Sequence, residues 1–203
     1  ESIEERTRGQ SACKIWFQQR AGRVTASNFK SAACTNPAQV SHSLVLSICY
    51  PGKQFFSIQT TWGKEHEPIA HDAYIKKHQD NHKEFQYTLS GLVVSVLYPC
   101  MGATPDGIVK CDCCGNGVVE IKCPYSAKTK ALRALIEEHT FFLEQLGTVT
   151  ALKKDHAYYF QVQAQMKFCN ASYCDSVVWS PNHFSDERTY PDVKFADSDI
   201  EKV

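Results

Sequence analysis

The sequence Thr104-Pro105-Asp106-Gly107-Ile108-Val109, followed after a Gly-rich turn by Gly117-Val118-Val119-Glu120-Ile121-Lys122, decides the fold. In a β-strand successive side chains alternate between two faces, so Glu120 and Lys122 project from one face while their neighbours point into the core. If the turn is centred near Cys113 or Cys114, the returning strand brings Glu120 close to the start of the preceding strand, where cross-strand Cβ atoms lie about 4.5–5.5 Å apart. We therefore expect Asp106, Glu120 and Lys122 to meet at one end of a β-sheet.

Two carboxylates beside a lysine are typical of a metal site. Carboxylates at this separation repel unless a cation lies between them, and oxygen ligands favour Mg²⁺ or Mn²⁺. A neighbouring lysine can orient a water molecule and help to deprotonate it, which suits metal-assisted hydrolysis of a phosphodiester. Taken alone, Glu-x-Lys is more often the solvated face of a hairpin, and Pro-Asp-Gly an ordinary turn. Their combination and spacing favour the metal site.

The composition excludes several classes of protein. The chain has 203 residues, of which 43% are apolar, so it can bury a sizeable core, and disordered or collagen-like chains are excluded. No apolar run approaches the roughly 18 residues that span a bilayer, and the start has no signal-peptide pattern, so we expect a soluble protein with no membrane partner. Because no linker or repeat is visible, we expect residues 1–203 to form a single domain.

The net charge is zero, with 22 Lys and Arg against 22 Asp and Glu. This total does not exclude a nucleic-acid ligand, because phosphate binding needs local cations and not a basic whole. Residues 1–30 are locally basic, with six Lys and Arg against three Glu.

The periodicity of apolar residues predicts helices alternating with runs of strands. Thr25 or Ser27 is expected to cap a short helix. A second helix is expected to begin between Lys64 and Glu67 and to reach His78, because Pro68 is tolerated only near the first turn. An antiparallel meander is expected at Glu84–Leu89, Leu92–Val96, Cys100–Ala103, Gly107–Cys111 and Val118–Cys123. Two helices capped by Ser126 and Asp155 are expected to follow, and then closing strands at Val177–Trp179 and Tyr190–Phe195.

The chain contains ten cysteines, about 5% of its residues. This is below the 8–10% of a disulfide scaffold, and most of them are scattered, so we expect reduced thiols in an intracellular protein, of the nucleus or cytoplasm if it is eukaryotic or viral. Cys111, Cys113 and Cys114 form the one cluster, which could bind Zn²⁺ if Cys100 or Cys123 supplied a fourth ligand. Their spacing lacks the paired C-x₂-C arrangement of zinc sites, so it favours free thiols over a structural zinc.

Five ordered blocks carry a resemblance to a known family. They are Trp16-x-x-x-Arg20 with Gly22-Arg23-Val24-Thr25-Ala26-Ser27, Trp62-Gly63-Lys64-Glu65-His66-Glu67, Thr104-Pro105-Asp106-Gly107, Glu120-Ile121-Lys122-Cys123-Pro124, and Gln161-Val162-Gln163. On these blocks the chain, over roughly residues 14–168, resembles the PD-(D/E)xK nucleases, and among them the lambda-exonuclease-like, YqaJ-type viral recombinase nucleases. The resemblance implies a restriction-endonuclease-like α/β (mixed α+β) fold with a central mixed β-sheet flanked by helices.

The resemblance also implies roles for individual residues. The metal ligands would be Asp106, Glu120, the backbone carbonyl of Ile121 and Glu67. Lys122 would act on the water, and Gln161 would be the active-site glutamine. The 5′-terminal phosphate would be held by Arg20, Thr25, Ser27, Thr104 and Lys128. Because Lys128 stands where the phage enzyme has an arginine, it keeps the charge but lacks the bidentate fork, which weakens a strict requirement for a 5′-phosphate.

The function implied by the resemblance is a Mg²⁺- or Mn²⁺-dependent DNA nuclease with one or two ions. It would be a 5′→3′ exonuclease on double-stranded DNA with 5′-phosphorylated ends, acting in recombination, repair or replication, where a recombination protein could be its partner. The alternatives are an endonuclease or RNA-cleaving enzyme on the same core, a degenerate nucleic-acid-binding module, and a zinc-binding interaction domain. The family includes monomers and ring-like trimers, and the sequence leaves both open.

Overall fold

The computed structural model describes residues 1–52, 57–193 and 195. Its α-helices are α1 (Ile3–Arg6), α2 (Lys14–Arg20), α3 (Phe29–Ala33), α4 (His42–Cys49), α5 (Ile58–Gln79), α6 (Leu132–Ile136) and α7 (Ala157–Phe168). Short 3₁₀ helices are η1 (Gln10–Ala12), η2 (Ala26–Asn28), η3 (Pro37–Gln39) and η4 (Tyr125–Lys128). The strands are β1 (Val24–Thr25), β2 (Gln86–Leu89), β3 (Val93–Val94), β4 (Met101–Ala103), β5 (Gly107–Cys111), β6 (Gly115–Lys122), β7 (Leu143–Leu146), β8 (Val149–Leu152), β9 (Tyr173–Ser180) and β10 (His183–Thr189). Within the described residues, no helix has the length and apolar character needed to cross a membrane.

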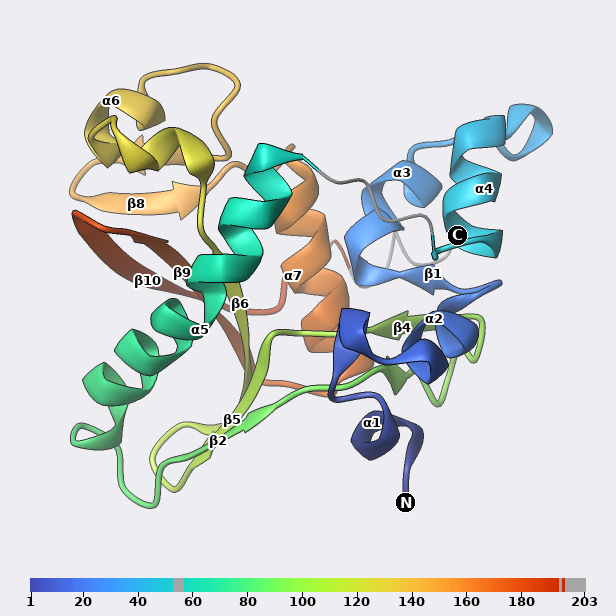
Figure 1. Cartoon of the computed structure of the whole chain (residues 1–203), viewed down its shortest axis with the longest axis horizontal. Helices are drawn as coiled ribbons and strands as arrows, with labels where there is room; N and C mark the ends of the chain where they lie inside the picture. Colours follow the sequence, from blue (N-terminus) through green and yellow to red (C-terminus); the bar gives the residue numbers. More distant parts are fainter. Residues whose placement is uncertain (53–56, 194, 196–203) are drawn as a thin grey trace.

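The central sheet has five strands in the order β10-β9-β6-β5-β2. β6 and β9 run parallel, whereas the other neighbours are antiparallel, so the sheet is mixed as predicted. The parallel pair needs a long crossover, and α7 lies within that connection. The expected restriction-endonuclease-like arrangement of a mixed sheet flanked by helices is therefore present (Figure 1).

The predicted meander is only partly right, because β3 and β4 leave the central sheet. They pair with each other, and β4 also pairs with β1. The cause lies at Ser90-Gly91, which the N-terminal helix holds. The Gly91 backbone N–H donates to the Glu4 carboxylate at 3.0 Å, and a Cβ at Gly91 would lie 1.9 Å from the Glu4 backbone oxygen. The chain is thus drawn toward α1 after β2, and β5 takes the place beside β2.

The two faces of β6 are covered by different helices (Figure 1). Val119 and Ile121 are buried in one core cluster with Ala70 and Tyr74 of α5. Val118 packs in another cluster that includes residues of α6, α7, β7 and β8. Burying each large aliphatic side chain contributes roughly 1.5–3 kcal/mol, so this alternation holds the register of β6 firmly. As a result Glu120 and Lys122 share one face of β6, as the pattern predicted, and Glu120 there contacts Gln161 and Gln165 of α7.

Helix α5 begins earlier than the sequence predicted. Ser57 is its N-cap and accepts the Thr60 backbone N–H at 3.2 Å, and the helix continues through Pro68. A proline inside a helix leaves the carbonyl four residues earlier unpaired. Lys64 and Pro68 are both exposed, so water can satisfy that carbonyl. The expectation that Pro68 must lie in the first turn was wrong for this reason.

Other boundaries also differ. Thr25 caps η2, as expected, whereas α7 is capped by His156 and not by Asp155, and Ser126 lies inside η4. The strand predicted at Val177–Trp179 is the longer β9, and the closing strand is β10, whose polar sequence hid it. The strand predicted at Tyr190–Phe195 was wrong, because the described residues of this segment, all but Lys194, form no strand after β10.

Candidate active site

The hairpin β5–β6 brings the two predicted carboxylates together. The register pairs Gly107 with Val119, which places Asp106 opposite Glu120 just beyond the paired residues. The Asp106 backbone N–H donates to the Val119 carbonyl at 3.0 Å, and the Ile121 backbone N–H donates to Asp106 Oδ2 at 2.6 Å. The Asp106 side chain is therefore clamped to β6 beside Glu120.

Glu120 is the most enclosed carboxylate of the site, with 4% of its surface exposed. Lys122 Nζ and Gln161 Nε2 both donate to its Oε1, the latter at 2.5 Å. Gln165 Nε2 donates to its Oε2 at 2.6 Å. A buried carboxylate is stable only when donors replace its hydration, and here β6 and α7 supply three of them.

The charges of the site act on one another. Burial, together with the negative charge of Glu120, raises the pKa of Asp106 well above its usual range, and Lys122 opposes this shift. Burial would lower the pKa of Lys122, but the charges of Glu120 and Asp106 outweigh it and raise that pKa. The Lys122 ammonium also lies 4.4 Å from the centre of the Tyr158 ring. The Lys122 ammonium is thus stabilised by the charges of Glu120 and Asp106 and by the face of the Tyr158 ring.

Glu67 reaches the same region from α5. It lines a surface cavity of about 290 Å³ together with Ile121, Lys122 and Tyr158. Its Oε1 lies 3.7 Å from His71 Nε2, and its negative charge contributes to the raised pKa of Asp106 after the effects of burial, Glu120 and Lys122. Glu67 of α5 and Lys122 of β6 therefore line one cavity, and the charge of Glu67 reaches Asp106.

Gly107 follows Asp106 for a steric reason. Tyr87 lies over it, and a Cβ on Gly107 would come within 2.3 Å of the Tyr87 hydroxyl. That hydroxyl is hydrogen-bonded to His71 Nδ1 on α5. Burial, followed by the charges of Asp106 and Glu67, raises the pKa of Tyr87. Because Gly107 has no Cβ, the Tyr87 ring can pack against the backbone next to Asp106.

The oxygen atoms that the site offers as metal ligands fit a hard divalent cation. A carboxylate offers about four lone-pair positions, and Glu120 uses three for N–H donors, which leaves it one to share. Burial, followed by repulsion from Glu120, raises the pKa of Asp106, and a bound cation would relieve that repulsion. Ile121, whose carbonyl the family resemblance assigns as a ligand, lines the same cavity as Glu67.

A second group of polar side chains is built around Arg20. Its guanidinium donates to the Thr25 hydroxyl at 3.2 Å and to the Ser27 hydroxyl at 3.3 Å, and it lies 4.1 Å from the centre of the Trp16 ring. Trp16 in turn donates to the Thr104 hydroxyl at 3.1 Å. Burial lowers the pKa of Arg20 to about 10. The structure thus joins four of the five residues predicted to hold a 5′-phosphate.

The fifth, Lys128, is placed differently. It lies in η4, and its ammonium is 5.0 Å from the centre of the Trp62 ring and 5.7 Å from that of Tyr125. Tyr125 lines the same cavity as Glu67, so Lys128 adds a positive charge close to its rim.

Comparison with known proteins identifies the family. Residues 15–172 match the model of the YqaJ-like viral recombinase domain. The chain belongs to this family. Membership confirms the resemblance found in the sequence and supports a DNA exonuclease that acts in recombination, with the divalent-metal dependence that is general for such nucleases. Among curated protein sequences, none matches the chain significantly.

Solved structures agree with the YqaJ-type fold. The alkaline exonuclease LHK-Exo from Laribacter hongkongensis superposes with a TM-score of 0.65 and 24% identity, covering 92% of this chain and 87% of its own. The shutoff and exonuclease protein from Kaposi's sarcoma-associated herpesvirus gives a TM-score of 0.53 and 13% identity, covering 92% and 65%. A SOX–DNA complex gives 0.53 and 14%, covering 91% and 59%.

The sequence reasoning missed some residues of this YqaJ-type site. The motif blocks do not include Gln165, yet its amide donates to Glu120; its position four residues after Gln161, on the same helix face, was the available signal. Gln163 is structural, because its amide bonds the Tyr190 carbonyl and the Asp192 backbone N–H. Tyr158, which packs on Lys122, carried no recognisable pattern.

Proposed function

We propose that the protein is a Mg²⁺- or Mn²⁺-dependent nuclease that degrades double-stranded DNA from its 5′ ends during recombination or repair. The observation that carries this proposal is the convergence of Asp106, Glu120 and Lys122 beside an open cavity, in a chain whose family is that of viral recombinases. The name of the structural neighbour LHK-Exo, an alkaline exonuclease, supports the same reaction.

The residues of the site have separable tasks. When bound, a divalent cation would be held by Asp106, Glu120, the Ile121 carbonyl and Glu67, and it would polarise the phosphate and acidify water. Lys122 orients the attacking water from its fixed position on Glu120. Gln161 and Gln165 keep the Glu120 carboxylate from turning, because each grips a different oxygen. Such fixed geometry is what allows a small site to stabilise a transition state.

The Arg20 group supports an end-dependent mode of action. A guanidinium flanked by two hydroxyls is a suitable receptor for a terminal phosphate, since it offers several donors to an anion. We infer that Arg20, Thr25 and Ser27 bind the 5′-phosphate, with Thr104 holding Trp16 in place. Lys128, on its aromatic support, would contact the backbone phosphates of the duplex.

The experiment compares end-labelled substrates. Linear duplex DNA with a 5′-phosphate, the same duplex with a 5′-hydroxyl, closed circular DNA and RNA are each incubated with Mg²⁺, and then with EDTA. We expect mononucleotides to be released from the phosphorylated duplex first, with no cleavage of the circle and none in EDTA. Cleavage of the circle or preferred cleavage of RNA would show an endonuclease or a ribonuclease instead.

A pair of variants distinguishes cleavage by this protein from cleavage by a contaminating nuclease. Lys122→Ala removes the proposed orienting cation, whereas Lys110→Ala removes an exposed lysine from the same hairpin. Loss of cleavage in Lys122→Ala alone supports the assignment. Equal activity of both variants would refute it.

A further inference from the structure

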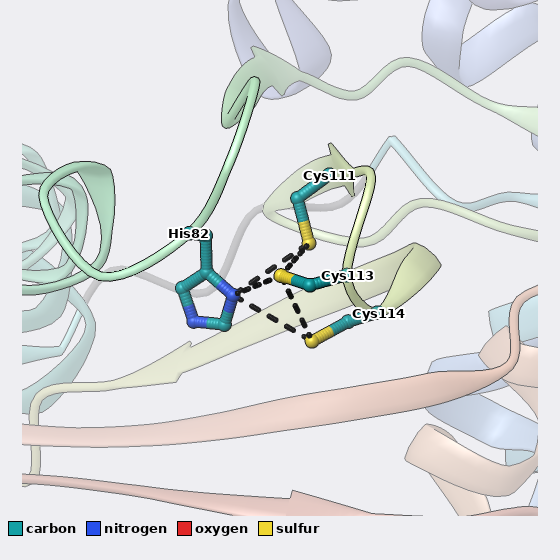
Figure 2. A group of neighbouring side chains, drawn as sticks. All are labelled: His82, Cys111, Cys113 and Cys114. Atoms are coloured by element: carbon teal, nitrogen blue, oxygen red, sulfur yellow. Dashed lines mark hydrogen bonds between the residues drawn. The ribbon is translucent and has the colours of Figure 1, made fainter.

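Four metal-binding side chains meet at the far tip of the catalytic hairpin. Cys111 ends β5, Cys113 and Cys114 form the turn, and His82 lies three residues after α5. Figure 2 shows their side chains pointing toward one another, with the His82 ring facing the three sulfurs. The structure therefore brings His82 to the cysteine cluster, in place of the Cys100 or Cys123 that the sequence suggested.

Five of the six distances between the ligand atoms match the edges of a tetrahedron, and the sixth, between Cys111 Sγ and Cys114 Sγ, is at most 4.8 Å. His82 Nδ1 lies 3.2 Å from Cys113 Sγ, 3.6 Å from Cys111 Sγ and 3.5 Å from Cys114 Sγ. Cys113 Sγ lies 3.5 Å from that of Cys111 and 3.7 Å from that of Cys114. For Zn–S bonds of about 2.3 Å and Zn–N bonds of about 2.05 Å, an ideal tetrahedron has S–S edges of about 3.8 Å and N–S edges of about 3.6 Å. The observed edges are close to these values.

The same distances argue for one ion. All four ligand atoms lie within 4.8 Å of one another, which leaves too little room for an iron–sulfur cluster, whose metals and bridging sulfides would spread the ligands further apart. Each of the ten cysteines, all within the described residues, is free. Three thiolates and an imidazole are the donors of a structural zinc site, and soft sulfur ligands disfavour Mg²⁺.

The surrounding residues hold this geometry. The Asp112 backbone N–H donates to the Lys83 carbonyl at 3.0 Å, which ties the turn to the segment that carries His82. The second ring nitrogen of His82 is 3.2 Å from His78 Nδ1, and His78 Nε2 bonds the Asp186 carboxylate. Zinc-bound histidines usually have such a partner on their other nitrogen, which fixes the ring orientation.

A positively charged side chain lies next to the cluster. A zinc ion with three thiolates carries one net negative charge. Arg188 is hydrogen-bonded to Cys114 and lies beside the cluster on β10. Its fork binds Asp175 at 2.8 and 2.9 Å, so the guanidinium is held in place. Because Asp175 already pairs with this cation, Arg188 offsets only part of the charge that the thiolates bring.

We propose that His82, Cys111, Cys113 and Cys114 bind one structural Zn²⁺. All four positions are filled by protein, so the site is closed and has no place for a substrate. Between Gly115 and Glu120, β6 rises about 3.3 Å per residue, which puts the zinc roughly 17 Å from the catalytic carboxylates. Its task is to fasten the C-terminal end of α5, the helix that carries Glu67, to the hairpin that carries Asp106 and Glu120.

The first test measures zinc in the full-length protein, purified with a reductant and without chelators. Elemental analysis is expected to find about one zinc per chain. A mercurial that titrates thiols should release this zinc to an indicator dye as the cluster thiols react, which needs no variant to fold. Absence of zinc, or iron in its place, would overturn the proposal.

The second test uses variants and cobalt. His82→Ala and Cys113→Ser are expected to reduce bound zinc to background, while Cys34→Ser and His139→Ala, which alter exposed residues, should retain it. Co²⁺ substituted into the wild-type protein should show the visible bands of a tetrahedral site and thiolate charge transfer. Octahedral cobalt spectra, or zinc that persists in both cluster variants, would contradict the assignment.

Discussion

The two ends of the β5–β6 hairpin differ in the donors that they offer. The open end presents Asp106 and Glu120, whose hard oxygens lie beside Lys122 and a cavity of about 290 Å³. The tip presents three sulfurs and one imidazole nitrogen in a closed set. Hard oxygen ligands with a neighbouring opening suit a metal that must meet substrate, whereas a complete set of soft ligands suits a metal that only holds structure. In one hairpin, the type of ligand atom and the openness of the site together distinguish the proposed catalytic end from the proposed structural end.

The largest expected effect is at the open end. Asp106→Asn keeps the size of the side chain but removes one of the two strand carboxylates. A loss of about 4 kcal/mol of transition-state stabilisation, within the several kcal/mol that a catalytic metal supplies, lowers the rate roughly 10³-fold. Because the variant also removes a repulsion with Glu120, its thermal stability should equal or exceed that of the wild type. Single-turnover cleavage and thermal unfolding measure the two effects.

Asp112→Asn is the matched control, since Asp112 is exposed in the turn of the same hairpin and pairs only loosely with Lys83 at 3.8 Å. It should cleave DNA at the wild-type rate. If Asp112→Asn lost as much activity as Asp106→Asn, the catalytic assignment of the open end would fail.

A smaller effect is expected from the helix that supports Glu120. Gln165→Leu removes the donor to Glu120 Oε2, and loss of such a partner of a metal ligand typically costs about 10–100-fold. As a positioning residue, Gln165 should change kcat and the Mg²⁺ concentration needed for half-maximal rate, with KM for DNA little altered. Steady-state kinetics over a Mg²⁺ series measure these quantities.

The neighbour two residues earlier provides the comparison. Gln163→Leu breaks hydrogen bonds to the Tyr190 carbonyl and the Asp192 backbone N–H, so it should lower stability and leave the Mg²⁺ dependence unchanged. An altered Mg²⁺ dependence in Gln163→Leu, or none in Gln165→Leu, would show that the grip on Glu120 is not what matters.

The tip has a supporting residue of the same kind. His78→Phe keeps a ring against Phe85 and Tyr74 but removes the nitrogen that partners His82. We expect zinc affinity to fall by about tenfold, at the lower end of the range for such partners, with cleavage of DNA nearly unchanged. Competition with a zinc-binding dye measures this affinity, and His139→Ala is the control. Unchanged affinity would mean that the hydrogen bonds from His82 through His78 to Asp186 do not contribute to zinc binding.

The comparison also shows how far the sequence could lead. At the open end, strand alternation and the turn position were enough to predict that Asp106, Glu120 and Lys122 meet, because all three lie in one hairpin. At the tip the same reasoning identified only the three cysteines. His82 lies in another segment of the chain, about 30 residues earlier, and spacing motifs for zinc ligands do not cover such a combination. Local pairing is visible in a sequence, whereas a ligand brought by helix packing is not.

The same limit explains the errors in the fold. The position of β3 and β4 depends on the contact of Gly91 with Glu4, which lie far apart in the sequence. The start of α5 depends on solvent reaching the carbonyl opposite Pro68, which the proline alone does not indicate. The mixed sheet was implied by the family resemblance, whereas apolar alternation predicted only the strands themselves and not the parallel pairing of β6 with β9.

The smallest effect concerns a carboxylate that belongs to neither end. Glu187 lies on β10 opposite Ser176, and burial raises its pKa to about 7. Since the folded pKa is above the unfolded value, the charged form is disfavoured in the fold, and stability falls as pH rises from about 4.5 to 7. Glu187→Gln should therefore match the wild type at pH 4 and be more stable at pH 8, by about 1–2 kcal/mol after allowance for partial exposure. Denaturant unfolding at both pH values measures this difference. A stability difference that does not change with pH would show that burial does not raise the pKa of Glu187. It would also weaken the argument that burial makes the Asp106 carboxylate depend on a cation.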